Sequence, residues 1–312
     1  MATIGSNNFT NASAFYAAIF SEVFQGDSLH ADNYTKYCKV DSQTGVRYEF
    51  DFLSSFPRFR KWLGPKVSKS TRANKFSIDV EKYEATTTVG QVSFNQQPLL
   101  VGSQIREWMG AARGLINDQV VQLLETANTA VGYDGVAFCG TTHPLDSGST
   151  QTNYSTSALS QTSYRAAAVA MMAFTDPVGR PLGIIPKKLI VGPSLAYIAR
   201  DIVEAKNRTQ GITSGGVLDG AASVVGAASI DNIVSNDGVE LIIEPYLTSN
   251  HWFLIGEAAD AKPVVVNIAR APEPKDDTTE YISGNSVYNF SIEAELAIGF
   301  GLWSCMYGNF AS

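Results

Sequence analysis

The sequence predicts an α+β protein, and three patterns along the chain support this assignment. Residues 98–131 carry apolar side chains at steps of three and four, the spacing of one face of a helix. Residues 34–95 and 262–300 alternate between apolar and polar side chains, with the period of two that strands have. Between them, strand and helix patterns follow one another over residues 133–261, which is typical of an α/β layer.

Composition and charge exclude several function classes. The 312 residues suffice for one large or two ordinary domains, and only 17% are charged, below the usual quarter. Either much of the surface is buried in an assembly, or a large core carries a Ser/Thr/Asn-rich surface. The net charge of −7 argues against a general nucleic-acid binder. We expect neither a membrane span nor a signal peptide, and the three cysteines indicate reduced, cytosolic thiols.

The N-terminal segment predicts an arm with an amphipathic helix. Residues 1–12 are small and polar, and Ser13 can cap a helix through Phe24. Its apolar side consists of Phe15, Ile19, Phe20 and Val23. Because an isolated helix of this length is marginal in water, it must dock on another element.

Residues 34–95 predict an extended β-hairpin arm. One pair of strands surrounds a turn at Gln43–Gly45, and a second set covers Phe76–Val80 and residues 86–94. Between the two sets lies a basic segment with aromatic residues, from Phe56 to Asn74.

The charge of this arm is opposite to that of the remaining chain. Seven of the 23 basic residues fall between Arg58 and Lys75 with no acidic residue, leaving 16 basic against 30 acidic residues elsewhere. They are Arg58, Arg60, Lys61, Lys66, Lys69, Arg72 and Lys75. We interpret the pattern as an arm that reaches acidic surfaces of neighbouring copies, where complementary potentials set register and partner choice. A solvated hairpin with a chance cluster, or a nucleic-acid patch, are the alternatives.

Residues Pro98–Val131 predict one long helix, a spine of roughly 45–50 Å at 1.5 Å per residue. Pro98 suits its first turn, and Gly132 is a stop signal. Gly102, Gly110 and Gly114 weaken the helix by about 1 kcal/mol each relative to alanine. We therefore expect a bend at or near Gly110 or Gly114, or a close backbone contact.

The remaining elements follow from local patterns. We expect helices over Ser160–Phe174 and Ser194–Ala205, strands over Lys188–Val191, Val239–Ile243 and His251–Ile255, and a flexible loop over Asn207–Gly226. A strand through Val264–Ile268 leads to a polar turn at Pro272–Thr279, and one or two strands return over residues 287–303.

Tests for chemistry give no active site. The three histidines lack metal-ligand spacing, and Cys139 with His143 lacks a third orienting group for a catalytic pair. Gly211–Gly220 lacks the Gly-Lys-Ser/Thr of a phosphate-binding loop. The acidic residues Glu273, Asp276, Asp277 and Glu280 indicate a solvated turn rather than a calcium loop. We predict no catalytic, cofactor-binding or metal-binding residue, and a structural protein that assembles.

Several motifs, in order, resemble one family over roughly residues 20–305. They are Phe56–Gly64 with its proline, basic residues, Trp62 and glycine, Phe76–Thr86, Tyr133–Phe138 with His143-Pro144, Gly179–Gly183, Pro186–Val191, Leu241–Leu247 and Trp252–Leu254. Together they resemble the Mu-like phage major head subunits, which have the Hong Kong 97-like capsid fold. In one departure, Gln91–Gln97 is uncharged where the family often has an arginine and acidic residues.

The resemblance implies a domain plan. It comprises an N-terminal arm (1–33), an extended β-hairpin arm or E-loop with adjoining strands (34–97), a spine helix of the peripheral domain (98–132), an axial domain (133–261), and long peripheral-domain strands with the C-terminus (262–312). Inter-subunit contacts are expected at Arg58, Arg60, Lys61, Trp62, Lys66, Lys69 and Arg72, with Glu273, Asp276, Asp277 and Glu280 as acidic partners.

The resemblance also implies a function. Hexamers and pentamers would form an icosahedral virion shell around double-stranded DNA, without sequence-specific binding and without a membrane. Assembly would take place in the host bacterial cytoplasm, with a separate scaffold and protease and a portal protein. The alternative is an encapsulin-like cargo compartment of the same fold.

Overall fold

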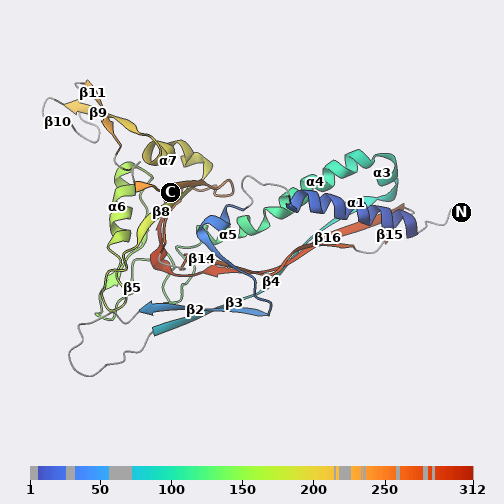
Figure 1. Ribbon diagram of the computed structural model, residues 1–312, viewed down its shortest axis with the longest axis horizontal. Coiled ribbons are helices and arrows are strands. Elements are labelled where there is room, and N and C mark those ends of the chain that lie inside the picture. Colours follow the sequence, from blue (N-terminus) through green and yellow to red (C-terminus); the bar gives the residue numbers. More distant parts are fainter. Residues whose placement is uncertain are drawn as a thin grey trace. The chain divides into compact units, whose positions relative to one another are not determined.

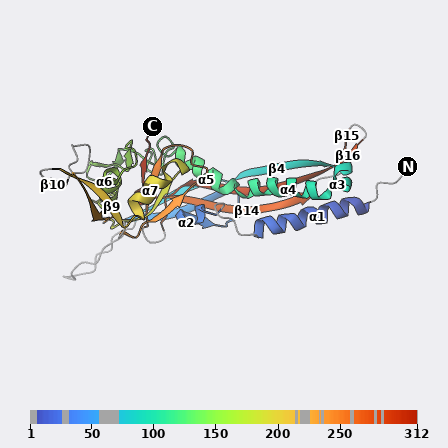
Figure 2. The same ribbon diagram turned by 90° about the horizontal axis from the view of Figure 1, so that it is seen from above.

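The computed structural model describes residues 6–25, 32–55, 72–213, 216–217, 226–232, 234, 237–257, 261–276, 280–282 and 285–311. The chain divides into two compact units (Figures 1 and 2). Unit 1 comprises Met1–Phe50, Phe76–Val120 and Val264–Gly299, and unit 2 comprises Asp51–Lys75, Val121–Pro263 and Phe300–Ser312.

Unit 1 is built on a sheet of long strands. The strands are β1 (Cys38–Asp41), β4 (Glu81–Gly90), β14 (Val264–Asp276), β15 (Glu280–Ile282) and β16 (Asn285–Phe300). β1 runs parallel to β14, and β4 runs antiparallel to β16, with Val287 opposite Gly90 and Leu296 opposite Glu81. Alternate residues of β16, including Tyr288, Phe290 and Ile292, are buried, as the period-two pattern predicts.

Helix α1 (Ser6–Gln25) lies alongside α4 (Pro98–Arg113) and closes the core of unit 1 (Figures 1 and 2). The ring of Tyr16 stacks on Phe290 with centroids 4.5 Å apart, and its hydroxyl donates to the carbonyl of Ser291 at 2.9 Å. The expected docking of this helix is therefore confirmed. Its expected start was wrong, because Ser13 lies inside a helix that already begins at Ser6.

The spine is not one helix from Pro98 to Val131. It consists of α4 and α5 (Leu115–Glu125), interrupted at Gly114, and turns follow Glu125. The hydroxyl of Thr126 donates to the carbonyl of Leu123 at 2.9 Å, a local bond that competes with helix continuation. The interruption agrees with the expectation for Gly114, whereas space around Gly110 is open.

The hairpin pairs differently from the expectation. β2 (Arg47–Ser55) pairs with β3 (Arg72–Asp79), whereas β1 joins β14 instead of pairing across the turn at Gln43–Gly45. The amide of Asn267 accepts from the backbone N–H of Gln43 at 2.7 Å and donates to its carbonyl at 2.9 Å, which fixes the turn against β14. At the two ends of the predicted arm, where we expected strands, the structure has two short helices, α2 (Tyr34–Tyr37) and α3 (Gln91–Gln96).

Unit 2 has a mixed sheet in the order β12–β8–β13–β17–β7. These strands are β7 (Tyr154–Ser155), β8 (Ile185–Val191), β12 (Glu240–Ile243), β13 (Trp252–Glu257) and β17 (Met306–Asn309). Leu189–Val191 of β8 and Trp252–Ile255 of β13 are all buried. Because both faces of these strands are covered, their sequences are continuously apolar rather than alternating.

The helices of unit 2 are α6 (Gln161–Met172) and α7 (Ala196–Val203), the latter after the short helix Pro193–Leu195. Ser160 and Ser163 cap α6 reciprocally, each hydroxyl accepting from the other residue's backbone N–H. Two short strands, β5 (His143–Pro144) and β6 (Thr150–Gln151), pair antiparallel beside this sheet.

Three further expectations need correction. The loop expected over Asn207–Gly226 contains strands, since β9 (Asn207–Thr213) pairs with β10 (Gly216–Val217) and β11 (Gly226–Asp231). The turn expected from Pro272 was wrong at its start, because β14 continues to Asp276. β1 pairs with β14 only from Val264 to Asn267. Beyond Asn267 this edge of β14 has no β1 partner, and such an edge tolerates the prolines Pro272 and Pro274. Strand β17 was not predicted. Its four residues are too few to show a periodic pattern, and they form a strand because they pair with the distant β13.

Candidate functional site

The segment Tyr133–Phe138 folds into a tight turn that fixes an aspartate in unit 2. Gly135 has a φ of +80°, a region that favours glycine, and the N–H of Gly132 donates to the carbonyl of Val136 at 2.7 Å. Asp134 Oδ1 accepts from the N–H of Val136 at 3.2 Å. The second carboxylate oxygen of Asp134 is thereby directed at His143.

His143 is fully buried and contacts three side chains. Its Nδ1 lies 2.6 Å from Asp134 Oδ2, and its Nε2 lies 3.0 Å from Asn153 Oδ1. The imidazole stacks on the indole of Trp303, with centroids 4.0 Å apart and 10° between the planes. His143 therefore joins the Tyr133–Phe138 turn to the C-terminal segment of unit 2.

Asn153 is the second buried centre of this cluster. Its Nδ2 donates to the carbonyls of Phe138 at 2.9 Å, Met306 at 3.1 Å and Trp303 at 3.3 Å. Its Oδ1 also accepts from the N–H of Gly140 at 2.8 Å. One side-chain amide thus provides hydrogen-bond partners for backbone groups from two distant parts of the sequence. Buried backbone groups need such partners, because water cannot reach them.

This cluster does not assemble a nucleophile from Cys139 and His143. Both ring nitrogens of His143 face oxygen atoms of Asp134 and Asn153. Burial raises the pKa of the Cys139 thiol, outweighing a backbone hydrogen bond from Gly308 that lowers it. The thiolate, which is the reactive form, is therefore disfavoured. The sequence-based interpretation of Cys139 as a buried apolar residue agrees with its position.

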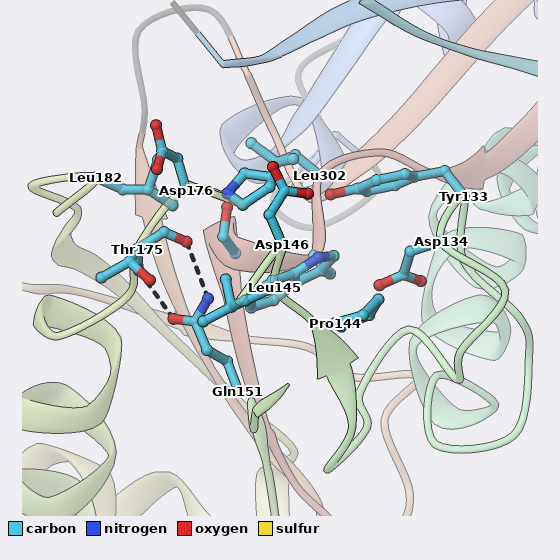
Figure 3. Close-up of a pocket in the computed structure, with 13 residues that line it drawn as sticks. Tyr133, Asp134, Pro144, Leu145, Asp146, Gln151, Thr175, Asp176, Leu182 and Leu302 are labelled. Carbon is cyan, nitrogen blue, oxygen red and sulfur yellow. Dashed lines mark hydrogen bonds between the residues drawn. The ribbon is translucent and has the colours of Figure 1, made fainter. Parts of the chain in front are cut away.

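A cavity of about 310 Å³ lies beside the cluster (Figure 3). It is lined by residues 133–134, 144–146, 151, 175–177, 182 and 302–304. Gln151 joins two of these segments, since its Nε2 donates to the carbonyl of Thr175 at 2.9 Å and its Oε1 accepts from the N–H of Thr175 at 2.8 Å. These paired bonds, drawn as dashed lines in Figure 3, hold the wall of the cavity together.

Three carboxylates line the cavity in different settings. Asp134 faces His143, whereas the buried Asp176 accepts from the N–H groups of Val178 at 3.0 Å and Arg180 at 2.8 Å. Asp146 is exposed. The pKa of Tyr133 is raised, first by burial and then by the charge of Asp134.

The residues predicted from the sequence as contact sites lie elsewhere. Glu273 is exposed on β14, Asp276 ends that strand, Glu280 begins β15, and Arg72 begins β3. Arg58, Arg60, Lys61, Trp62, Lys66, Lys69 and Asp277 lie outside the described residues. Glu273, Asp276 and Glu280 belong to unit 1, and their role as acidic partners of the arm stays a prediction.

No local sequence pattern indicated the cavity itself. Tyr133, Asp134, His143 and Pro144 stood out as one motif, but Asp146, Gln151 and Trp303 did not. Trp303 reaches the site because β17 returns the C-terminal segment beside β13. A pairing between residues so far apart leaves no local pattern to detect.

Large apolar side chains are exposed on both units. Leu99 is 89% exposed and Tyr197 is 79% exposed. Leu99 lies within residues 85–105, which contain no charged residue. Among the described residues, no helix is long and apolar enough to cross a membrane, and no cluster of three or more metal-ligating side chains occurs.

Comparison with known proteins identifies relatives of this chain. The profile of the family described as Mu-like prophage major head subunit gpT matches residues 13–158 and 150–230. The major capsid protein of Escherichia phage Mu is 26% identical over 124 residues, which are 39% of this chain and 41% of that protein. The match thus spans less than half of the curated relative.

Solved structures with similar folds are capsid and particle proteins. A chain of the bacteriophage JBD30 procapsid has a TM-score of 0.53 and 17% identity, covering 99% of this chain and 77% of its own. A chain of Microbacterium phage Oxtober96 has a TM-score of 0.56 and 10% identity, and the match covers 92% of this chain and 93% of that chain. A chain of a virus-like particle from Pyrococcus furiosus has a TM-score of 0.51 and 11% identity, and the match covers 95% of this chain and 98% of that chain. At these identities the likeness establishes the fold alone, which is the Hong Kong 97-like capsid fold.

Proposed function

The chain belongs to the Mu-like prophage major head subunit family, and from this premise we propose that it builds the head of a tailed phage or prophage. Copies of the chain form hexamers and pentamers of an icosahedral shell around double-stranded DNA. The observation that carries this proposal is the family match, which covers residues 13–230. The role is structural, without catalysis.

The surface of the chain supports burial in an assembly. Only 17% of the residues are charged, and large apolar side chains such as Leu99, Leu100 and Tyr197 are exposed. Charged residues are depleted at the cores of protein interfaces, whereas aromatic residues are enriched. Residues 85–105, without any charge, are suited to such an interface core.

We assign the parts of the chain by this function. Unit 1 supplies the peripheral domain with α4, β14 and β16, residues 133–261 supply the axial domain, and residues 34–97 contain the hairpin arm. Arg58, Arg60, Lys61, Trp62, Lys66, Lys69 and Arg72 of the arm bind acidic surfaces of a neighbouring copy. Glu273, Asp276, Asp277 and Glu280 form one such surface.

Other partners follow from the same function. A separate scaffold and protease act during assembly in the host cytoplasm, a portal protein occupies one vertex, and DNA is enclosed without sequence-specific contacts. The net charge of −7 supports the absence of a general phosphate-binding surface. An encapsulin-like cargo compartment is not favoured, because the matching family is one of phage head subunits.

Electron microscopy of the purified chain tests the proposal. We expect closed shells with fivefold and sixfold capsomers. Reversing the arm charge with the double substitution Arg60→Glu and Lys61→Glu should block or misdirect assembly, since it places like charges against acidic partners. The matched control reverses Lys187 and Lys206, two exposed lysines of unit 2. Shells of normal form from the arm variant would contradict the role of the arm, and absence of any particle would contradict the function.

A further inference from the structure

The cavity beside His143 combines negative charge with aromatic walls. Its lining includes the carboxylates of Asp134, Asp146 and Asp176 but no lysine or arginine. Tyr133 and Trp303 contribute aromatic rings, and Leu145, Leu182 and Leu302 contribute apolar surface. Figure 3 shows the carboxylate of Asp146 and the hydroxyl of Tyr133 pointing toward one another. Such walls suit a cationic head on an apolar or aromatic stem.

The cavity is held in shape before anything binds. On one side, the N–H of Asp146 donates to the carbonyl of Pro177 at 2.8 Å, and the N–H of Leu145 donates to the carbonyl of Ser149 at 2.9 Å. Gln151 and Thr175 form paired bonds across the wall. Trp303 is fixed by its stack on His143. A preformed site pays little ordering entropy on binding.

Its size suits side chains rather than a whole domain. About 310 Å³ lies at the lower end of ordinary ligand pockets, which hold one small molecule or a few side chains. An occupant on another polypeptide must therefore offer a short segment with adjacent cationic and aromatic residues. A guanidinium or an ammonium next to an aromatic ring meets both requirements of the walls.

Such a segment occurs in the chain itself. Arg58-Phe59-Arg60-Lys61-Trp62 combines three cations with two aromatic rings, and no acidic residue follows it before Lys75. Elsewhere the chain is acidic, with 30 acidic against 16 basic residues outside the Arg58–Lys75 stretch. Charge complementarity thus selects this segment as the occupant.

We propose that the cavity lined by Asp134, Asp146, Asp176 and Trp303 receives side chains of the Arg58–Trp62 segment of a second copy of the chain. This inference rests on the proposed assembly and names a second docking site for the arm. The aromatic, N-terminal part of the basic segment occupies the cavity. Lys66, Lys69 and Arg72 remain available for the acidic residues Glu273, Asp276, Asp277 and Glu280.

Directed cross-linking tests the contact and its direction. The described cysteines Cys38, Cys139 and Cys305 are all buried, so an introduced surface cysteine is the preferred target of a short bismaleimide. One chain carries Arg60→Cys and a differently tagged chain carries Asp146→Cys. We expect a cross-linked product that contains both tags. Asp201→Cys, at an exposed aspartate on α7, is the matched control and should give little product.

Two outcomes would overturn the inference. One is equal cross-linking of Asp146→Cys and Asp201→Cys. The other is a product formed only within a single chain that carries both Arg60→Cys and Asp146→Cys, which would mean that the arm returns to its own subunit.

Charge reversal provides a second test. Asp146→Lys should lower the yield of assembled particles on the order of tenfold, and Arg60→Glu in the same chain should restore part of it. Asp201→Lys makes the same charge change outside the cavity and should leave assembly unchanged. Normal shells from Asp146→Lys would overturn the inference while leaving the proposed function intact. Absence of shells from the unmodified chain would instead contradict the proposed function.

Discussion

The indole of Trp303 lies face to face with the imidazole of His143, with 4.0 Å between the ring centroids. The two residues come from different segments of unit 2, Val121–Pro263 and Phe300–Ser312. Asn153 strengthens the same junction, because its amide donates to the carbonyls of Trp303 and Met306. Unit 2 is thus closed by a buried polar and aromatic cluster, whose loss should affect stability rather than catalysis.

Asn153→Asp should destabilise unit 2 by about 3–5 kcal/mol. The substitution places a carboxylate oxygen against three carbonyl oxygens, in a site with no exposed surface, and removes the donor that they share. Denaturant unfolding followed by tryptophan fluorescence measures the change. Asn250→Asp is the control, since Asn250 is exposed. Equal stability of the two variants would contradict the assigned role of Asn153.

Glu257 should give unit 2 a pH-dependent contribution to stability. Hydrogen bonds from Lys188, at 2.5 Å, and Lys262, at 2.6 Å, lower the pKa of Glu257 to about 2. Because the pKa is lowered on folding, the contribution is present above the unfolded value of roughly 4.3 and is lost as the pH falls towards about 2.

Glu257→Gln tests this contribution by thermal unfolding at several pH values. The variant should be less stable than the unmodified chain at pH 7 by about 1 kcal/mol or less, since the pair is partly exposed. The difference should shrink below pH ~4.3. Glu204→Gln, which removes an exposed carboxylate outside this ion pair, is the matched control. A difference that grows on acidification would reverse the sign and refute the assignment.

Gly110→Ala should stabilise α4 by about 0.5–1 kcal/mol, because alanine has the higher helix propensity and nothing lies within 4 Å of the added methyl. Gly102→Ala is the matched comparison in the same helix. Its methyl would lie 3.0 Å from the ring of Phe15 on α1, so the neighbour must shift and the gain should be smaller or absent. Thermal unfolding of both variants distinguishes these cases, and equal gains would mean that Phe15 does not restrict Gly102.

Leu99→Glu should reduce assembly without unfolding the chain. Leu99 is 89% exposed within an uncharged stretch, and a charge in an interface core carries a desolvation cost. Sedimentation of assembled particles measures the effect, and circular dichroism checks the fold. Leu99→Met, which keeps an apolar side chain of similar size, should assemble normally. If both variants assemble equally well, this surface lies outside the contacts.

The native chain should react slowly with a thiol reagent. Cys38, Cys139 and Cys305 are buried, and burial raises the pKa of Cys139. All three thiols should become reactive in denaturant. Rapid modification of the folded chain would place at least one cysteine in a different environment.

Local sequence patterns predicted the elements whose burial is periodic. The apolar stripe of α4 and α5 and the alternation of β16 each identify an element, because one face of each is buried. The glycine at position 114 also marked the interruption of the spine. Helix ends were less accurate, since side-chain bonds such as that of Thr126 compete with the helix at its terminus.

By itself, the sequence determined the α+β class, the motif that carries Asp134 and His143, and the resemblance to a family of head subunits. Tertiary structure alone decided that β1 joins β14, that β17 returns beside β13, and that Trp303 covers His143. The physical reason is the range of the interactions. Propensity, capping and periodicity act over a few residues and leave a local pattern, whereas strand pairing and cavity walls depend on residues that meet only after the chain has folded.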